Sequence, residues 1–410
     1  MLELQDLQTH NGIAGVLFDD MARWATPQFT KGQVDRAGTA LANNNLSKVE
    51  RAETLNIINN WRSLHGYPLH IAKKNLQTRA WKIDVQSISA QRLKRLSSIA
   101  LKLRRNPNMK LTQMQDIGGC RAVLPSMFDV KQLIEVYDKA IAKNPPPKKE
   151  RPPETGSAPI QSKKEKPPSR AELVERYDYI NNPKPDGYRS YHYVFKYRSA
   201  AEDKQIYNGL RIEIQIRTKL QHAWATAVEA ISTFTEQALK SGIGDVRWKR
   251  FFALMGTAIA KREGCPIVPG TPAGERELIS ELHQLFIELQ VEMVLAGITA
   301  TVQMVRDDAN AQAYLLVLDA DKKFLEIKSY KANEMSNASQ EYLLVEEQYA
   351  DNPTVQAVLV SVDSLATLQS AYPNYYLDTG EFLAAVRLAI YGHSPTGGFS
   401  EDARKAQTKR

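Results

Sequence analysis

One segment of the chain constrains the fold more than any other, because its residues alternate strictly between apolar and polar. Residues 209–218 read GLRIEIQIRT, with isoleucines at positions 212, 214 and 216. Successive side chains of a strand point to opposite faces, so the isoleucines would be buried and the polar side chains between them would share the other face. The sequence therefore predicts a strand with a polar stripe made of Glu213, Gln215 and Arg217.

A second carboxylate is expected close to Glu213. Residues 114–124 read MQDIGGCRAVL, and Asp116 lies just before the short apolar run Ala122–Leu124, where a strand is expected to begin. An Asp and a Glu on neighbouring strands can share one Mg²⁺, whose remaining ligands would be phosphate oxygens. Two ordinary surface carboxylates are the alternative interpretation.

A loop rich in proline and glycine precedes a third predicted strand. Residues 182–197 read NPKPDGYRSYHYVFKY, and the alternation places His192 and the tyrosines that flank it on opposite faces. Tyr188 follows the turn residue Gly187, where its ring could stack on a nucleobase. Packing is the more common role of a tyrosine at such a position.

A cationic helix is expected over Gln91–Arg105, QRLKRLSSIALKLRR. At about 100° per residue, its apolar side chains form one stripe and its basic side chains fall on the opposite side. Next to two carboxylates, this basic face could hold a triphosphate, although such faces are usually only solvated. The chain contains neither GxxxxGK nor GxGxxG, so neither a P-loop nor a Rossmann fold is predicted. The polar face comprises Lys94, Arg95, Ser98, Lys102 and Arg105.

Four ordered motifs resemble the synthetase domain of RelA/SpoT-type pyrophosphokinases, and the resemblance covers roughly residues 50–235. The resemblance implies an α+β fold in which a mixed sheet is flanked by helices. It also implies ATP as the pyrophosphate donor and Mg²⁺ as the cofactor. The motifs are RxKxxxSxxxK from Arg92 to Lys102, DIxGxR from Asp116 to Arg121, PKxxGYxSxH from Pro183 to His192 and ExQIRT from Glu213 to Thr218.

The resemblance also implies a role for each residue at a motif position. Arg92 and Arg121 would sandwich the adenine of ATP, and Tyr188 would stack on the acceptor base. The metal would be held by Asp116 and Glu213, and Glu213 would also activate the attacking hydroxyl. The phosphates would be bound by Lys94, Ser98 and Lys102, while the polar positions near the acceptor and the phosphates are His192, Gln215 and Arg217.

The implied reaction moves a pyrophosphoryl group. A ribose 3′-hydroxyl attacks the β-phosphorus of ATP, AMP leaves, and Mg²⁺ and the basic residues offset the negative charge on the transferring group. Glu213 can accept the hydroxyl proton. Polymerase-type nucleotidyltransferases usually carry an Asp-x-Asp pair, which Asp116 lacks, so the sequence argues against a polymerase.

The composition fits an intracellular enzyme. The chain has 410 residues, a net charge of +8 and two cysteines, which provide neither a disulfide framework nor a zinc pattern. We expect no signal peptide and no membrane-spanning segment, and hence a cytoplasmic protein. The basic excess favours an anionic partner, either a nucleotide or a nucleic acid. None of the seven histidines is followed by Asp, so the hydrolase domain of long bifunctional relatives is not expected.

The chain is predicted to contain an enzyme domain, residues 1–264, and a smaller C-terminal α+β domain, residues 275–410, joined by a linker at 265–274. Residues 145–169, which are rich in proline and charge, are expected to form a disordered insertion. The C-terminal domain should contain helices over 275–296, 332–349 and 380–391 and strands over 313–319, 324–330 and 355–362.

The C-terminal domain has no catalytic cluster, but its segment 371–378, AYPNYYLD, places Tyr372 and Tyr375 in a Y-x-x-Y spacing. Together with WRSLHGYPL (61–69) and QHAWATAVE (221–229), this loop resembles the fused toxin–antitoxin branch of the family, the CapRel-like proteins of phage defence. The resemblance implies that the Y-x-x-Y element covers the ATP site until a phage protein binds the C-terminal domain. It also implies that the acceptor is the 3′ CCA end of tRNA, whose modification stops translation.

Two alternatives to this function stay open on the sequence. A small-alarmone synthetase would make ppGpp or pppGpp from ATP and GDP or GTP, with the same catalytic residues. A non-catalytic RNA-binding or scaffolding protein is disfavoured, because all the acidic and basic motif positions are filled.

Overall fold

The computed structural model describes most of the chain. The expected insertion at 145–169 lies outside the described residues, and so does Tyr375. The described residues are 24–43, 46–143, 171–238, 245–296, 301–306, 311, 313–349, 352, 354–361, 368–369, 371–372, 376 and 379–392.

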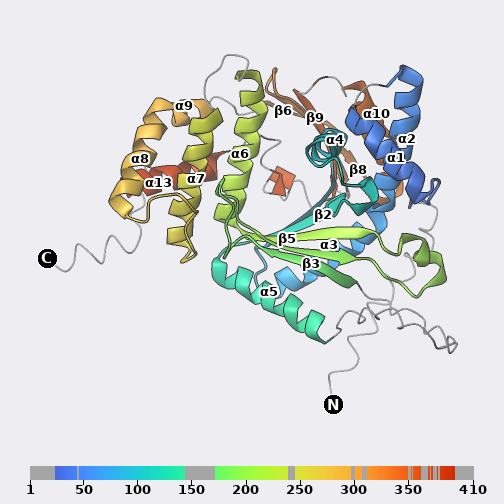
Figure 1. Ribbon diagram of the computed structural model, residues 1–410, viewed down its shortest axis with the longest axis horizontal. Coiled ribbons are helices and arrows are strands. Elements are labelled where there is room, and N and C mark those ends of the chain that lie inside the picture. The colour runs from blue at the N-terminus through green and yellow to red at the C-terminus, as the bar shows by residue number, and fades with distance from the viewer. Residues whose placement is uncertain are drawn as a thin grey trace.

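One mixed sheet runs through the middle of the molecule (Figure 1). Among the described residues, nine strands lie in the order β3-β4-β5-β2-β1-β9-β7-β8-β6. β5 is parallel to β2, whereas β1 is antiparallel to both of its neighbours. The strands are β1 (Ile88–Leu93), β2 (Gly118–Leu124), β3 (Glu172–Asp178), β4 (Tyr191–Lys196), β5 (Arg211–Thr218), β6 (Thr301–Arg306), β7 (Ala313–Asp319), β8 (Phe324–Tyr330) and β9 (Val355–Ser361).

Helices cover the sheet and fix which face of β5 is buried. α3 and α5 pack on the face that carries the isoleucines, where Leu76, Leu133 and Ile214 belong to one buried cluster. The polar stripe predicted on β5 therefore lies on the opposite face. The described helices are α1 (Lys31–Asn43), α2 (Lys48–Leu64), α3 (Gly66–Trp81), α4 (Leu96–Arg105), α5 (Met127–Ala142), α6 (Lys219–Ala238), α7 (Asp245–Arg262), α8 (Glu275–Glu288), α9 (Val291–Ala296), α10 (Met335–Gln348) and α13 (Gly380–Tyr391).

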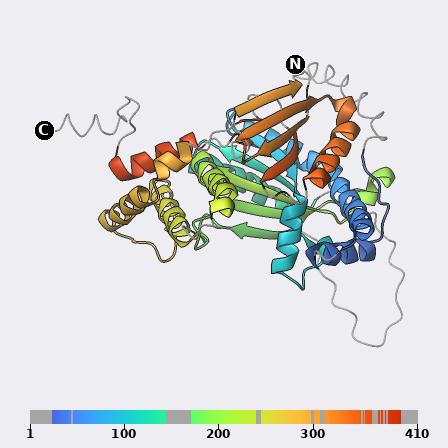
Figure 2. The same ribbon diagram turned by 90° about the horizontal axis from the view of Figure 1, so that it is seen from above.

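The C-terminal part of the chain continues the same sheet. β9 pairs with β1, with Gln91 opposite Ser361 and Arg92 opposite Val360. Figure 2 shows the C-terminal strands and α10 beside the N-terminal helices, whereas α8, α9 and α13 lie at the other side of the molecule, against α6 and α7. The C-terminal region (residues 275–410) thus contacts the enzyme region (residues 1–264) at two separate places.

The two regions also share a hydrophobic core. Phe251 of α7, Phe382 of α13 and Leu316 of β7 belong to a single buried cluster. The segment 265–274, which joins α7 to α8 without a helix or strand, is held in place by the fully buried Val268. The predicted boundaries at 264 and 275 stay a prediction. Because side chains from both sides of these boundaries are buried in one core, the enzyme region would lose core contacts without the C-terminal region.

The expected α+β class is confirmed, and so are the predicted strands β7, β8 and β9 and the helices α10 and α13. Two helix predictions are wrong in their extent. Residues 88–93 form β1, and α4 begins only at Leu96, because the backbone of residues 91 and 92 pairs with both β2 and β9. The helix expected over 275–296 is broken between α8 and α9, where Gln290 has a φ of 48°.

Candidate active site

The register of the sheet brings the sequence motifs into two rows on the face opposite α3 and α5. Neighbouring strands lie about 4.8 Å apart, and paired residues point to the same face, so motifs far apart in the sequence meet here. The first row contains Arg92, Gly119, Glu213 and Val194, from β1, β2, β5 and β4. The second contains Arg121, Gln215, His192 and Tyr177, from β2, β5, β4 and β3.

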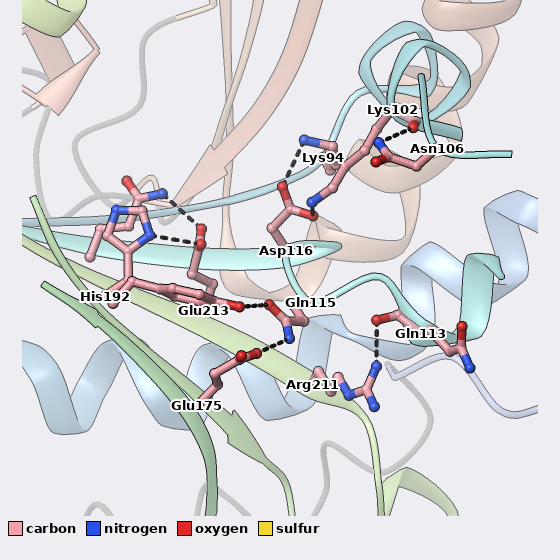
Figure 3. Close-up of polar contacts among 12 residues, drawn as sticks. Lys94, Lys102, Asn106, Gln113, Gln115, Asp116, Glu175, His192, Arg211 and Glu213 are labelled. Atoms are coloured by element: carbon pink, nitrogen blue, oxygen red, sulfur yellow. Dashed lines mark hydrogen bonds and ion pairs between the residues drawn. The ribbon is translucent and has the colours of Figure 1, made fainter. Parts of the chain in front are cut away.

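Asp116, two residues before β2, is held between two lysines (Figure 3). Its carboxylate oxygens lie 2.8 Å from the Nζ atom of Lys94 and 2.8 Å from that of Lys102. Burial acts to raise the pKa of Asp116, but the two ammonium groups outweigh it and hold the pKa below its usual range. Two of the three predicted phosphate-binding residues thus contact an ionised carboxylate, and the third, Ser98, lies one turn before Lys102 on α4.

Glu213 is linked to Tyr188 by a chain of hydrogen bonds. His192 Nδ1 lies 3.0 Å from Glu213 Oε1, and His192 Nε2 lies 2.9 Å from the Tyr188 hydroxyl. Gln215 Nε2 donates to the second oxygen of Glu213 at 2.7 Å. Burial acts to raise the pKa of Glu213, but the hydrogen bond and charge of His192 prevail, and the pKa is lowered. The structure thus brings four predicted site residues into one network around an ionised carboxylate.

The loop before β4 gives the Tyr188 ring a fixed position. Gly187 has a φ of 98°, and a Cβ atom there would lie 2.8 Å from the main-chain oxygen of Phe252, so the close approach to α7 requires glycine. The Tyr188 ring meets the ring of Trp224 edge-on, with centroids 6.3 Å apart. Burial raises the pKa of Tyr188 to about 12, which keeps its hydroxyl protonated.

The charges of four arginines, Arg92, Arg95, Arg121 and Arg217, act on Glu229 of α6, which the sequence analysis did not single out. Arg92 approaches it to 3.9 Å. Burial acts to raise the pKa of Glu229, but the arginines outweigh it and lower the pKa. Burial, together with repulsion from Arg121, lowers the pKa of Arg217 to about 10. Glu229 is the single acidic residue of the segment 221–229, and this isolated charge is the sequence signal from which it could have been identified as a site residue.

Tyr372 of the C-terminal region fills the space between Arg121 and β1. Its ring centre lies 4.7 Å from the guanidinium carbon of Arg121, and its hydroxyl donates to the main-chain oxygen of Gln91 at 2.5 Å. Arg121 also donates to the main-chain oxygen of Ala371. The cavity that remains between these groups, Asp116 and Glu213 measures about 70 Å³. Sites for small molecules usually measure roughly 300–1,000 Å³, so the cavity beside Tyr372 is smaller than such a site usually is.

A second contact joins the C-terminal region to the loop that carries Lys94. Arg62 of α2 is 1% exposed and pairs with Glu346 of α10 at 2.6 Å. It also donates to the Tyr342 hydroxyl at 2.6 Å and to the main-chain oxygen of Lys94 at 3.0 Å. The other oxygen of Glu346 accepts from the Leu96 backbone N–H, at the first turn of α4, at 3.2 Å. The sequence contained no signal for this network.

The carboxylates fit a Mg²⁺ site that a substrate completes. Asp116 and Glu213 offer the hard oxygen ligands that Mg²⁺ prefers. Within the described ranges, no group of three or more His, Cys, Asp or Glu residues could hold a metal ion. The protein would therefore supply two ligands, and phosphate oxygens and water would supply the rest. Lys94 and Lys102 would have to leave Asp116 for the phosphates.

Comparison with known proteins finds a family match for the central part of the chain. Residues 91–238, from β1 to α6, match the family model described as a region found in RelA / SpoT proteins. No curated protein matches the chain. In the part of the chain that the structure describes, no helix combines the length and the hydropathy needed to cross a membrane.

Several solved structures are similar to the chain. Small alarmone synthetase 1 from Bacillus subtilis, bound to its product pppGpp, is 23% identical, with a TM-score of 0.33; the match covers 48% of this chain and 90% of that one. A GTP pyrophosphokinase family protein from Streptococcus pneumoniae is 24% identical, with a TM-score of 0.32; the match covers 48% of this chain and 88% of that one.

Proposed function

We propose that the chain is a pyrophosphokinase that transfers pyrophosphate from ATP to the 3′-hydroxyl at the CCA end of tRNA; the match of residues 91–238 to the region found in RelA / SpoT proteins supports this reaction. We further propose that its C-terminal region holds it in an inactive state, as in the CapRel-like toxin–antitoxin proteins that its sequence resembles. A phage protein that binds the C-terminal region would release this state. The tRNA modification would then stop translation.

The single observation that carries the proposal is the contact between Arg121 and Tyr372. Family resemblance gives Arg121 the role of stacking on adenine, and in the structure a tyrosine ring lies against its guanidinium instead. A planar aromatic ring on this cation is a chemical substitute for a base. The 70 Å³ cavity left beside it supports a closed state.

The residues around the cavity suit pyrophosphoryl transfer once ATP replaces Tyr372. Lys94, Ser98 and Lys102 would bind the phosphates and place the β-phosphorus before the acceptor. Bound Mg²⁺ would supply neutralisation of charge on the transferring group. Arg92, Arg121 and Arg217 add fixed positive charge on the same side.

Glu213 is proposed to take the proton from the attacking hydroxyl. His192 holds one carboxylate oxygen and Gln215 the other, so the orientation of Glu213 is set before the acceptor arrives. The Tyr188 hydroxyl is fixed by the same histidine, so an acceptor base stacked on Tyr188 would lie next to the proposed base catalyst. The lowered pKa keeps Glu213 ionised at neutral pH, which is the form that can accept a proton, and it also makes the carboxylate a weaker base.

A labelling experiment tests both the reaction and the acceptor. The full-length chain, as wild type and as Tyr372→Ala, is incubated with γ-labelled ATP and Mg²⁺ in the presence of deacylated tRNA or GDP. Label on the tRNA supports the proposal, and label on GDP alone would replace it with alarmone synthesis. Salt provides an independent check: transfer to tRNA should fall steeply as salt is raised, because many phosphate contacts are lost, whereas transfer to GDP should fall little.

A further inference from the structure

We infer that Tyr177, at the edge of the sheet, carries the base that precedes the acceptor nucleotide, so that the acceptor site is built for a single-stranded RNA 3′ end. This inference rests on the proposed function and deepens it, because it names a residue that would distinguish a polynucleotide acceptor from a free nucleotide. Tyr177 belongs to none of the four motifs of the RelA/SpoT resemblance.

The position of Tyr177 follows from the register. Tyr177 is paired with His192 across β3 and β4, so its side chain shares the face on which Glu213 and Tyr188 lie. β3 is the terminal strand of the sheet, and Tyr177 is half-buried there. A partly exposed aromatic ring next to the proposed acceptor site is the kind of surface on which an unpaired base stacks.

An aromatic run connects the two positions. The ring of Tyr179 meets that of Tyr188 edge-on, with centroids 5.9 Å apart, and lies parallel to that of Tyr177, with centroids 5.7 Å apart and an interplanar angle of 2°. The run therefore begins at the proposed acceptor base and ends at the sheet edge. Consecutive nucleotides of a single strand need such a series of aromatic surfaces, whereas a single nucleotide uses one.

The charge beside this run matches a phosphodiester. The exposed Lys184 places its Nζ atom 4.5 Å from the ring centre of Tyr179 and 5.1 Å from that of Tyr188. A phosphate that joins two nucleotides bound along these rings would pass close to this ammonium group. Proteins that bind single strands combine cations and stacking rings in this way.

A purely structural role for Tyr177 is the competing explanation. Its hydroxyl donates to Gln115 Oε1 at 3.1 Å. Gln115 Nε2 donates in turn to Glu175 at 2.6 Å (Figure 3). Gln115 precedes Asp116 in the chain. In the structural explanation, the sole function of the hydrogen bond from Tyr177 to Gln115 is to position Asp116, the proposed metal ligand. The two roles use different parts of the side chain: stacking needs the ring, and the bond to Gln115 needs the hydroxyl.

The test compares two ligands and three variants in the full-length chain. Binding of fluorescein-labelled ribotrinucleotide CpCpA and of fluorescein-labelled AMP is measured by anisotropy for Tyr177→Ala, Tyr177→Leu and Tyr177→Phe. We expect the Ala and Leu variants to bind the trinucleotide about ten- to hundredfold more weakly and AMP within twofold of wild type, while the Phe variant binds both normally. The Leu variant keeps apolar volume at the sheet edge and guards against loss of the fold.

Several results would overturn the inference. An equal loss for both ligands, or a Phe variant as weak as the Ala variant, would make Tyr177 a structural residue. So would a wild-type chain that binds the trinucleotide no better than AMP. Failure of the proposed function is distinguishable, because it would appear as no label on any acceptor in the transfer assay while trinucleotide binding still depends on the Tyr177 ring.

Discussion

The guanidinium carbon of Arg121 lies 4.7 Å from the ring centre of Tyr372, although 250 residues separate Arg121 from Ala371, the neighbour of Tyr372 to which it also donates a hydrogen bond. Arg121 belongs to β2, within the residues that match the RelA/SpoT region, and Tyr372 belongs to the C-terminal region. A ligand that stacks on the same face of the Arg121 guanidinium must displace Tyr372 first. If ATP stacks on Arg121 as proposed, the contact makes ATP affinity and the position of the C-terminal region dependent on each other.

Tyr372→Ala should raise the apparent affinity for ATP and the rate of transfer. The change removes a cation–π contact worth about 0.5–2 kcal/mol and one hydrogen bond worth roughly 0.5–1.5 kcal/mol. Together they predict an increase of about five- to several-hundredfold in the open population. ATP binding by calorimetry and growth of bacteria that express the variant provide the measurements. Unchanged ATP affinity and unchanged growth would show that Tyr372 does not inhibit.

Tyr372→Phe is the matched control, because it keeps the ring on Arg121 and loses only the hydroxyl that bonds to Gln91. It should fall between wild type and Tyr372→Ala. Truncation at residue 265 is a weaker test of the same idea. It would remove β9 from the edge of β1 and Phe382 from the core around Phe251, so lost activity could reflect lost stability.

The parts of the site that the sequence predicted depend on local patterns. β5 was predictable because one of its faces is buried against α3 and α5, which enforces the alternation. The start of α4 was not predictable from local patterns. Residues 91 and 92 pair with β9, about 270 residues away, and such a distant pairing overrides local periodicity. The roles of Arg92 and Arg121 came from family resemblance alone.

No sequence pattern predicted the contact between Arg62 and Glu346. Nothing in helical periodicity distinguishes an arginine that will be fully buried from one on the surface. The pairing also joins residues 284 positions apart. Such buried pairs emerge only when the elements that carry them are packed together.

Glu346→Ala should destabilise the docking of α10. The change leaves the guanidinium of Arg62 buried with no carboxylate partner from α10, and removal of one member of a buried ion pair typically costs about 3–5 kcal/mol. We expect hydrogen exchange of α10 and β9 to accelerate more than that of α3 and α5. Equal acceleration throughout would indicate global unfolding instead of local release.

The double variant Arg62→Met with Glu346→Leu separates pairing from packing. If the pair couples α10 to α2, the two changes together should cost less than the sum of the single changes, with a coupling of about 0.5–3 kcal/mol. Urea unfolding of the four proteins gives this number. A sum that is simply additive would mean that Arg62 and Glu346 act independently.

Stability should fall as the pH is lowered from about 6.5 to about 4, in part because of His65. Burial lowers the pKa of this histidine to about 4, from an ordinary value of 6.5, and its Nδ1 atom lies 2.8 Å from the main-chain oxygen of Trp61. Between these pH values the unfolded chain binds a proton that the folded chain does not. The contribution is therefore fully present above pH 6.5 and is lost as the pH falls toward the folded pKa, by about 1.4 kcal/mol per pH unit.

His65→Asn tests this assignment, because the amide can still donate to Trp61 but does not titrate. The difference in the free energy of unfolding between pH 7 and pH 5 should shrink in the variant. A variant with the same pH dependence as wild type would assign the loss to other groups.

Asp116→Asn and Glu213→Gln should each lower pyrophosphoryl transfer by orders of magnitude while leaving the fold intact. Asp116→Asn removes the charge that faces Lys94 and Lys102, and Glu213→Gln removes the proposed base and the second metal ligand. The measurement is single-turnover transfer in the Tyr372→Ala background, where the ATP site is open. Lys139→Ala, which breaks an exposed pair with Glu135 far from the site, is the control and should transfer normally.

Raising the Mg²⁺ concentration should partly restore transfer by Asp116→Asn, because mass action overcomes weakened metal binding. It should not restore transfer by Glu213→Gln, because the proton acceptor is gone. Wild-type rates in either folded variant would reject the carboxylate pair as the catalytic centre.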